Sequence, residues 1–228
     1  PVAKLEAPEG EAPPLKTPVP PQARATALKL IREALALARG DTGWNAVSVW
    51  QEWARLEPES ALAAAPEGQI RQRVQLRAGE KLLAVDFPRA LEVLKQAPPG
   101  WGVSTLLEGA WRYRHSRPEL ARQCVEAALA ELPSMTDWRV RFVPGYRARL
   151  GQVLVEIQDP RGPGLLEEAF DAALDLPVIG DVAIYARGQV AAIYATVNVD
   201  DALALLAPVE AEREQDKREL QRALAAVA

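Results

Sequence analysis

From residue 23 onward, apolar residues recur every three or four positions along almost the whole chain. This spacing places them on one face of an α-helix, which has 3.6 residues per turn. In the stretch 105–133, Leu106 and Ala110 belong to one such face, and a second apolar stripe begins after Pro118. Proline suits the first position of a helix, where its missing N–H would have no partner. The pattern therefore predicts two helices that fold back on each other at Arg117-Pro118.

The same pattern predicts five antiparallel helical pairs. These pairs are 23–38 with 44–56, 69–85 with 88–96, the two halves of 105–133, 138–157 with 164–176, and 182–197 with 200–227. We also expect a short helix near 59–66 and breaks or kinks at Pro144 and Pro208. Asn198 or Asp200 should cap the last second helix, whose many charges are typical of a solvated helix that caps an array. Valine, isoleucine and threonine do not alternate with polar residues, so the fold class is all-α.

Residues 1–22 are rich in proline and lack periodicity, which predicts an extended arm or linker ahead of one helical domain at 23–228. The chain begins with Pro1 rather than methionine, so we expect that an upstream segment has been removed. A proline-rich tether suits a position after an export signal. This favours an exported or membrane-anchored protein over a cytoplasmic one.

Four glycines fall midway along predicted first helices, where a small residue lets two helices approach closely. They are Gly79, Gly109, Gly151 and Gly188. Two alanines, Ala121 and Ala128, are expected to have the same role in the second half of 105–133.

In that stretch, Gly109, Ala121, Ala128 and Pro133 resemble the small glycine, close-approach alanines and terminal proline of a tetratricopeptide-like repeat, although Arg112 stands where that family usually has an aromatic residue. The resemblance implies a right-handed α-α superhelix, a solenoid of about five hairpins whose first helices line a concave surface. The uneven glycine spacing straddles roughly 34 residues for this family and roughly 40 for HEAT-like repeats, so a HEAT-like solenoid is the alternative.

Charge and composition reduce the number of functional classes to which the chain could belong. The chain has 228 residues, 49% of them hydrophobic, a net charge of −4 and a pI of about 5.3. This content is enough for a substantial core, and no apolar run reaches the roughly 18 to 20 residues that span a bilayer. The acidic balance argues against a HEAT-like protein that binds nucleic acid, because no excess of positive charge remains to release counterions.

Candidate chemistry is sparse. His115 is the only histidine and Cys124 the only cysteine, and neither has a partner pattern for catalysis or zinc. The adjacent acids Glu167-Glu168 and Asp200-Asp201 would point about 100° apart on a helix, so they do not converge on a metal. We therefore expect no enzyme activity, no metal and no cofactor, and a toroidal helical enzyme is the least favoured alternative.

Charge differs between the two helices of each predicted pair. Second helices are acidic, whereas first helices carry arginines and aromatic residues: Arg71, Arg73, Arg77, Lys81, Trp101, Trp111, Arg112, Tyr113, Arg114, Trp138, Arg139, Arg141, Phe142, Tyr146, Arg147, Arg149, Tyr185 and Arg187. Arginine and large aromatic residues dominate binding hot spots. The alternative is that these aromatics belong to the core and the arginines are merely solvated.

The favoured function is a protein-binding or scaffold module that captures a peptide segment or a partner protein, possibly acidic, on the concave face. The candidate partner-binding residues are Arg112, Tyr113, Arg141, Tyr146, Arg149 and Arg187.

Overall fold

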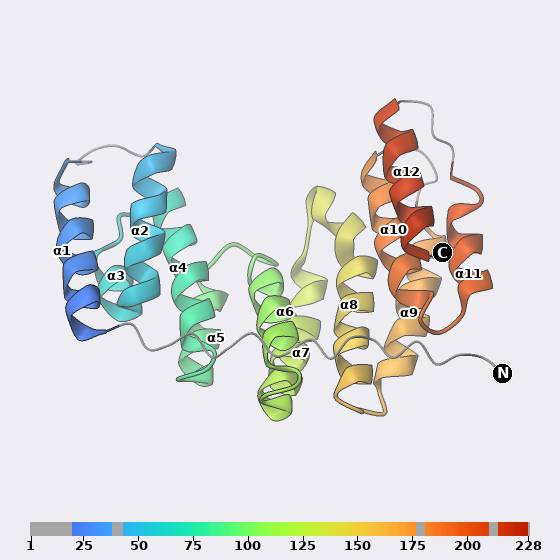
Figure 1. The fold of residues 1–228 in the computed structure, drawn as a ribbon, viewed down its shortest axis with the longest axis horizontal. Helices are drawn as coiled ribbons and strands as arrows, with labels where there is room; N and C mark the ends of the chain where they lie inside the picture. The colour runs from blue at the N-terminus through green and yellow to red at the C-terminus, as the bar shows by residue number, and fades with distance from the viewer. Residues whose placement is uncertain (1–19, 38–42, 177–180, 210–213, 228) are drawn as a thin grey trace.

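The computed structural model describes residues 20–37, 43–176, 181–209 and 214–227. These residues form twelve α-helices and two short 3-10 helices, and they contain no β-strand (Figure 1). The all-α fold class is therefore confirmed. The predicted arm at 1–22 lies almost wholly outside the described residues, and the first helix begins at Pro21 rather than at residue 23.

The α-helices are Pro21–Leu37 (α1), Trp44–Leu56 (α2), Pro58–Ala64 (α3), Gln69–Leu82 (α4), Phe87–Lys95 (α5), Gly102–Tyr113 (α6), Pro118–Glu131 (α7), Val143–Glu156 (α8), Gly162–Leu174 (α9), Asp181–Tyr194 (α10), Val199–Leu206 (α11) and Glu214–Val227 (α12). The 3-10 helices are Leu132–Ser134 (η1) and Asp137–Phe142 (η2). A proline at the first or second position begins α3, α5, α7 and α9, and for α7 this is the predicted Pro118.

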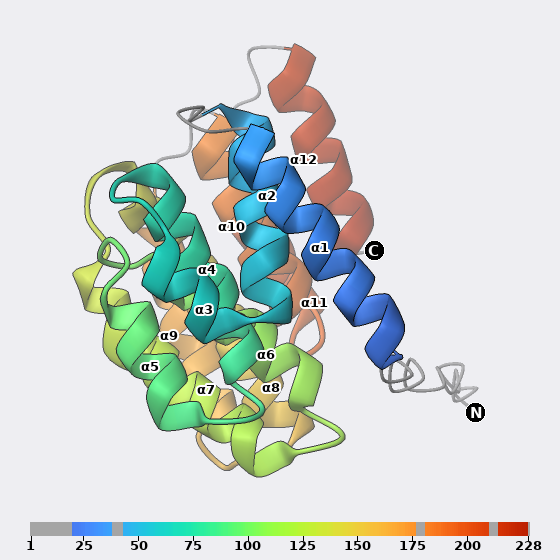
Figure 2. The same cartoon turned by 90° about the vertical axis from the view of Figure 1, so that its left-hand side faces the viewer.

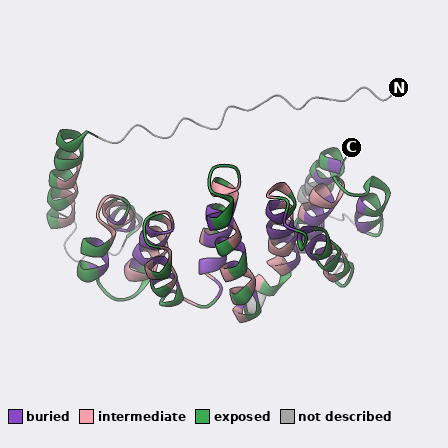
Figure 3. Cartoon of the chain, turned by 90° about the horizontal axis from the view of Figure 1, so that it is seen from below, coloured by how far each residue is buried: buried purple, intermediate pink, exposed green. Residues whose placement is uncertain are grey.

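The helices stand side by side in chain order along the molecule (Figure 1). In one layer, α2 packs on α4, α4 on α6, α6 on α8 and α8 on α10. Each of these five helices also packs on the helix that follows it in sequence, α3, α5, α7, α9 or α11. Seen from below, the row is bowed (Figure 3). The structure thus contains five helical pairs with additional helices, α1 and α12, at its two ends.

The predicted first pair is present, because α1 packs on α2. Helix α1 is nevertheless the outermost helix at this end of the molecule (Figure 2) and contains no buried residue. Helix α2 also packs on the short helix α3, which was expected near 59–66, and on α4, and its Ala54 is buried. The sequence pattern identified an amphipathic α1 without indicating how little of it the core covers.

The small residues in the helix centres lie at close contacts, as predicted. A Cβ atom on Gly79 would lie 2.5 Å from Leu94, and one on Gly109 would lie 2.7 Å from Leu83. The corresponding distances are 3.0 Å from Gly151 to Leu166 and 2.8 Å from Gly188 to Ala223. Ala121 and Ala128 are completely buried.

The breaks or kinks expected at Pro144 and Pro208 take two different forms in the structure. The kink expected at Pro144 is a change of helix type, because η2 ends at Phe142 and Pro144 lies in the first turn of α8. The break expected at Pro208 separates α11 from α12. Asn198 caps α11 as predicted, since its side-chain oxygen accepts hydrogen bonds from the backbone N–H groups of Asp200 and Asp201.

Arginines connect neighbouring pairs of helices. Arg89 of α5 binds Glu59 of α3, Arg112 of α6 binds Glu80 of α4, and Arg161, at the start of α9, binds Glu126 of α7. The partners lie 30, 32 and 35 residues apart in sequence. These ion pairs are largely exposed, so each contributes little to stability.

Candidate partner-binding surface

Trp101 lies next to the third of the five first helices. It precedes α6, and its backbone N–H donates to the carbonyl of Pro98. The carboxylate of Glu131 accepts hydrogen bonds from the N–H groups of Gly100 and Gly102 on either side. Burial raises the pKa of Glu131, and these two bonds oppose that shift. The backbone that carries Trp101 is therefore fixed by the end of α7.

Two arginines from different elements lie against the Trp101 ring. The guanidinium carbon of Arg73, on α4, is 5.1 Å from the ring centroid, and that of Arg139, on η2, is 4.9 Å from it. Arg139 also donates to the carbonyl of Pro99 at 3.4 Å. Cations at this range are attracted to the electron-rich face of an indole ring. Trp101 therefore brings together two positive charges that are far apart in sequence.

The same surface continues along α8 and α10. Tyr146 is half-buried, and burial raises the pKa of its hydroxyl while Arg149 and Arg139 act in the opposite direction. Tyr185 of α10 is 47% exposed and meets Phe142 edge-on, with ring centroids 6.2 Å apart. We call Arg73, Trp101, Arg139, Tyr146, Arg149 and Tyr185 the arginine–aromatic strip.

The predicted site residues divide into three groups. Tyr146 and Arg149 belong to the strip, and exposed Arg141 lies beside it on η2. Arg112 and Tyr113 lie at the other end of α6 from Trp101. Arg112 binds Glu80 at 2.8 Å there, and Tyr113 packs against the core with the guanidinium of Arg117 near its ring. The structure does not bring this pair together with the strip.

Arg187 is a correction to the prediction. It is 3% exposed, and its guanidinium donates to the carbonyls of Leu174, Leu176 and Leu205, at the ends of α9 and α11. Helix ends leave such carbonyls without intrahelical partners, and a cation there is favoured by the helix dipoles. Arg187 therefore holds the interior of the last helical pair together and is not available on a surface.

Arg73 and Arg139 are the functional candidates that the predicted set lacks. Both belong to the arginine-rich first layer, but their sequence neighbours do not set them apart from other arginines. Only the packing of α4 and η2 around the start of α6 shows that they share one aromatic ring. The sequence does contain one indication of this site. The Pro98-Pro99-Gly100 turn ends one helix and so places Trp101 at the start of the next.

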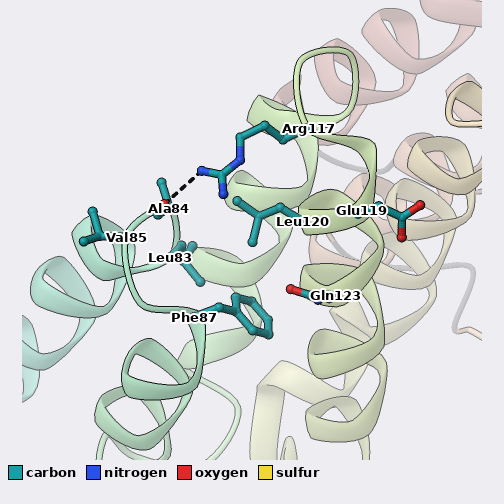
Figure 4. A pocket seen from close by; sticks show the side chains of 8 residues that line it. All are labelled: Leu83, Ala84, Val85, Phe87, Arg117, Glu119, Leu120 and Gln123. Atoms are coloured by element: carbon teal, nitrogen blue, oxygen red, sulfur yellow. Dashed lines mark hydrogen bonds between the residues drawn. The ribbon is translucent and has the colours of Figure 1, made fainter.

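A separate hollow lies between neighbouring pairs, away from the strip. It has a volume of about 250 Å³ and lies between the turn after α4, with Leu83 and Val85, the first residue of α5, Phe87, and the start of α7, with Leu120 (Figure 4). Arg117 spans its rim by donating to the carbonyl of Ala84 at 2.9 Å. A similar hollow of about 190 Å³ lies beside the Arg89–Glu59 ion pair. Arg71 and Gln96 also line the second hollow, and Glu119 and Gln123 line the first.

The surroundings of the single cysteine and the single histidine suggest structural roles for both residues. Cys124 is fully buried, and burial raises the pKa of its thiol to about 12, so it is not a nucleophile at neutral pH. His115 is exposed, and its Nε2 lies 3.5 Å from the Glu156 carboxylate, which also binds Arg114. Within the part of the chain that the structure describes, no three His, Cys, Asp or Glu side chains cluster as they would around a metal ion.

None of the described helices is both long enough and apolar enough to cross a lipid bilayer.

Comparison with protein families, with curated proteins and with solved structures finds no match to this chain.

Proposed function

We propose that the chain is a non-catalytic binding module, a solenoid of the tetratricopeptide-like kind that captures a peptide segment or partner protein on its arginine–aromatic strip. The observation that carries this proposal is the gathering of three arginines and three large aromatic residues from α4, α6, η2, α8 and α10 on connected positions of one layer. Side chains of these types supply most of the binding energy in protein interfaces.

The charges of the strip favour an acidic partner. Arg149 and Glu108 lie 3.9 Å apart, at the limit of an ion pair, and both side chains are partly exposed. Among the described residues, Arg141 has no ion-pair partner. An acidic segment that lies along the strip would replace water around these guanidinium groups with charge-assisted hydrogen bonds.

The bow of the helical row suits the capture of an extended segment. Successive first helices contact one another directly, so their exposed positions form a continuous path across several pairs. A segment that contacts many first helices gains affinity from several weak contacts at once, as in other stacked helical repeats.

The test is binding of acidic, neutral and basic peptides to the full chain, with a double charge reversal on the strip side. Arg141→Glu with Arg149→Glu should weaken the capture of acidic peptides by about tenfold or more. The matched control is Arg32→Glu with Arg55→Glu, two exposed arginines of α1 and α2 outside the strip. Helicity and thermal midpoint should be unchanged in both variants. Equal loss in both, or binding of duplex DNA that falls steeply with salt, would contradict the proposal.

A further inference from the structure

We propose that α1 is a self-association surface, on which the α1 helix of a second copy of this chain packs in the antiparallel direction. Helix α1 lies at one end of the row of helices (Figures 2 and 3) and contains no buried residue. The proposal is independent of the binding function proposed above, because none of the strip residues lies on α1. It is carried by an uncovered apolar face, by the sizes of the residues on that face and by the charges beside it.

Helix α1 has two apolar faces, and α2 covers only one of them. Leu28, Ile31 and Leu35 are half-buried on the side that packs on α2. At 3.6 residues per turn, Leu30 and Leu37 lie more than about 90° further round the helix. Leu30 is 60% exposed there, and Leu37, at 89%, is the most exposed large hydrophobic side chain among the described residues. Apolar side chains aligned on an exposed face mark a surface that another apolar surface covers.

The uncovered face alternates small and large residues. Ala27, Leu30, Ala34 and Leu37 follow one another at intervals of three or four positions, which is the spacing of a seam between two helices. If two copies of α1 are related by a two-fold axis at residue 32, Leu30 of one copy lies opposite Ala34 of the other. In the same register, Leu37 lies opposite Ala27. Each leucine therefore fills the space beside an alanine, and a two-fold interface requires such self-complementarity.

The alternation also sets the direction of the second helix. A parallel pair in register would place leucine opposite leucine and alanine opposite alanine. The leucine layers would then hold the two helices apart, and voids would remain at the alanine layers, which is unfavourable for close packing. The antiparallel pair has a leucine and an alanine in every layer, so the helices lie at one even distance along the whole seam.

The charges beside the seam are balanced in this register. Lys29 and Glu33 lie on one edge of the face, 3.9 Å apart, and both side chains are more than half exposed. In the antiparallel pair, the two Glu33 side chains approach each other near the axis, and Lys29 of each copy lies within about one turn of Glu33 of the other. Arg32, at the centre of the register, is exposed on the opposite side of the helix, so it brings no like charges together.

Sedimentation velocity of the full chain over a range of concentrations tests the surface. A seam between two single helices is smaller than a standard protein interface of about 1,600 Å², so association should be weak and should depend on concentration. The measured mass should rise from that of one chain, 24.8 kDa, towards twice that value as concentration increases to several hundred micromolar, about 0.5 mM at most.

The charged variant Leu30→Glu with Leu37→Glu should raise the dissociation constant by at least about tenfold, because the seam would have to bury carboxylates without partners. The matched control is Leu203→Glu with Leu224→Glu, which changes two exposed leucines of α11 and α12 at the other end of the row. The control should associate as the wild type does. Circular dichroism should show the same helicity for both variants, because all four leucines are exposed.

Introduced cysteines test the direction of the seam. Mild oxidation of an equimolar mixture of Ala27→Cys and Leu37→Cys chains should give a mixed disulfide between the two positions. Neither variant alone should crosslink, because the antiparallel register places two copies of the same position about 15 Å apart along the helix axis, too far for a disulfide. The native Cys124 is buried and does not compete.

Three results would overturn the proposal. A wild type that stays monomeric over the whole concentration range has no such surface. Efficient crosslinking of Leu37→Cys chains with one another would show a parallel pair. Equal loss of association in the Leu203→Glu and Leu224→Glu control would show that α1 of one copy meets the other end of the next, which forms an open chain and not a two-fold dimer. None of these results bears on the capture of acidic peptides, which the strip variants test separately.

Discussion

The Nε atom of Arg122 lies 2.9 Å from a carboxylate oxygen of Asp159, although 37 residues separate the two in sequence. Asp159 lies in the turn between α8 and α9 and is 6% exposed. Its carboxylate also accepts hydrogen bonds from the backbone N–H and the guanidinium of Arg161. These bonds, those from Arg161 first, hold the pKa of Asp159 well below its usual range, while burial opposes them. A single carboxylate therefore joins α7 to the turn that closes the next pair.

Replacing Asp159 by asparagine should lower the free energy of unfolding by about 1.5 to 3 kcal/mol, the usual value for hydrogen bonds to a charged group. Because the folded-state pKa is lowered, the contribution is fully present above the unfolded pKa of about 3.9 and is lost as pH falls towards the folded value. Denaturant unfolding at pH 7 and pH 3 measures it. A difference between wild type and Asp159→Asn that is the same at both pH values would show that the charge does not matter.

The close contact at Gly109 should make this position sensitive to size. Gly109→Leu would place a side chain where Leu83 and Cys124 already lie, and overpacking of this kind costs about 1 to 3 kcal/mol. Gly164 is the control, because a Cβ atom there meets nothing within 4 Å. Gly164→Ala should raise stability by up to about 1 kcal/mol through better helix propensity. Thermal melts of both variants decide whether the spacing of α6 and α7 depends on a glycine.

Removal of the Arg187 guanidinium should destabilise the C-terminal pairs. Arg187→Met keeps most of the side-chain volume but leaves the carbonyls of Leu174, Leu176 and Leu205 without their donor. Each buried unsatisfied group costs about 1 to 3 kcal/mol, so we expect a loss of at least about 2 kcal/mol in denaturant unfolding. Arg141→Met, at an exposed position, should be neutral. A neutral Arg187→Met would mean that water replaces the guanidinium without cost.

Cys124 should report on unfolding. Burial raises its pKa to about 12, above the value of about 8.5 in an unfolded chain. At pH 8, iodoacetamide should modify the native protein only as fast as the protein opens, and labelling should accelerate sharply at the denaturation midpoint. Because the folded-state pKa is raised, this thiol favours the folded state below pH 8.5 and that preference is lost as pH rises towards 12. Rapid labelling of the native chain would place Cys124 on an accessible face.

The sequence by itself determined which segments are helical and most of the breaks between them. Helical periodicity and helix boundaries are local properties. An apolar stripe is recognised from residues within two turns of one another, and Pro58, Pro88, Pro118 and Pro163 interrupt a preceding helix whatever the rest of the chain does. The close approach at Gly109 was predictable for the same reason, since a glycine in the middle of an amphipathic helix lacks any other evident role.

The tertiary structure alone decided which arginines are available. Arg187 and Arg149 both lie on first helices with similar patterns, yet Arg187 is buried because the carboxyl ends of α9 and α11 meet at its position. In the same way, Arg73 and Arg139 become neighbours only because both guanidinium groups lie about 5 Å from the ring of Trp101, the residue before α6. Helical periodicity indicates the face on which a side chain lies, but the environment of that face depends on residues 30 or more positions away, whose approach is set by packing.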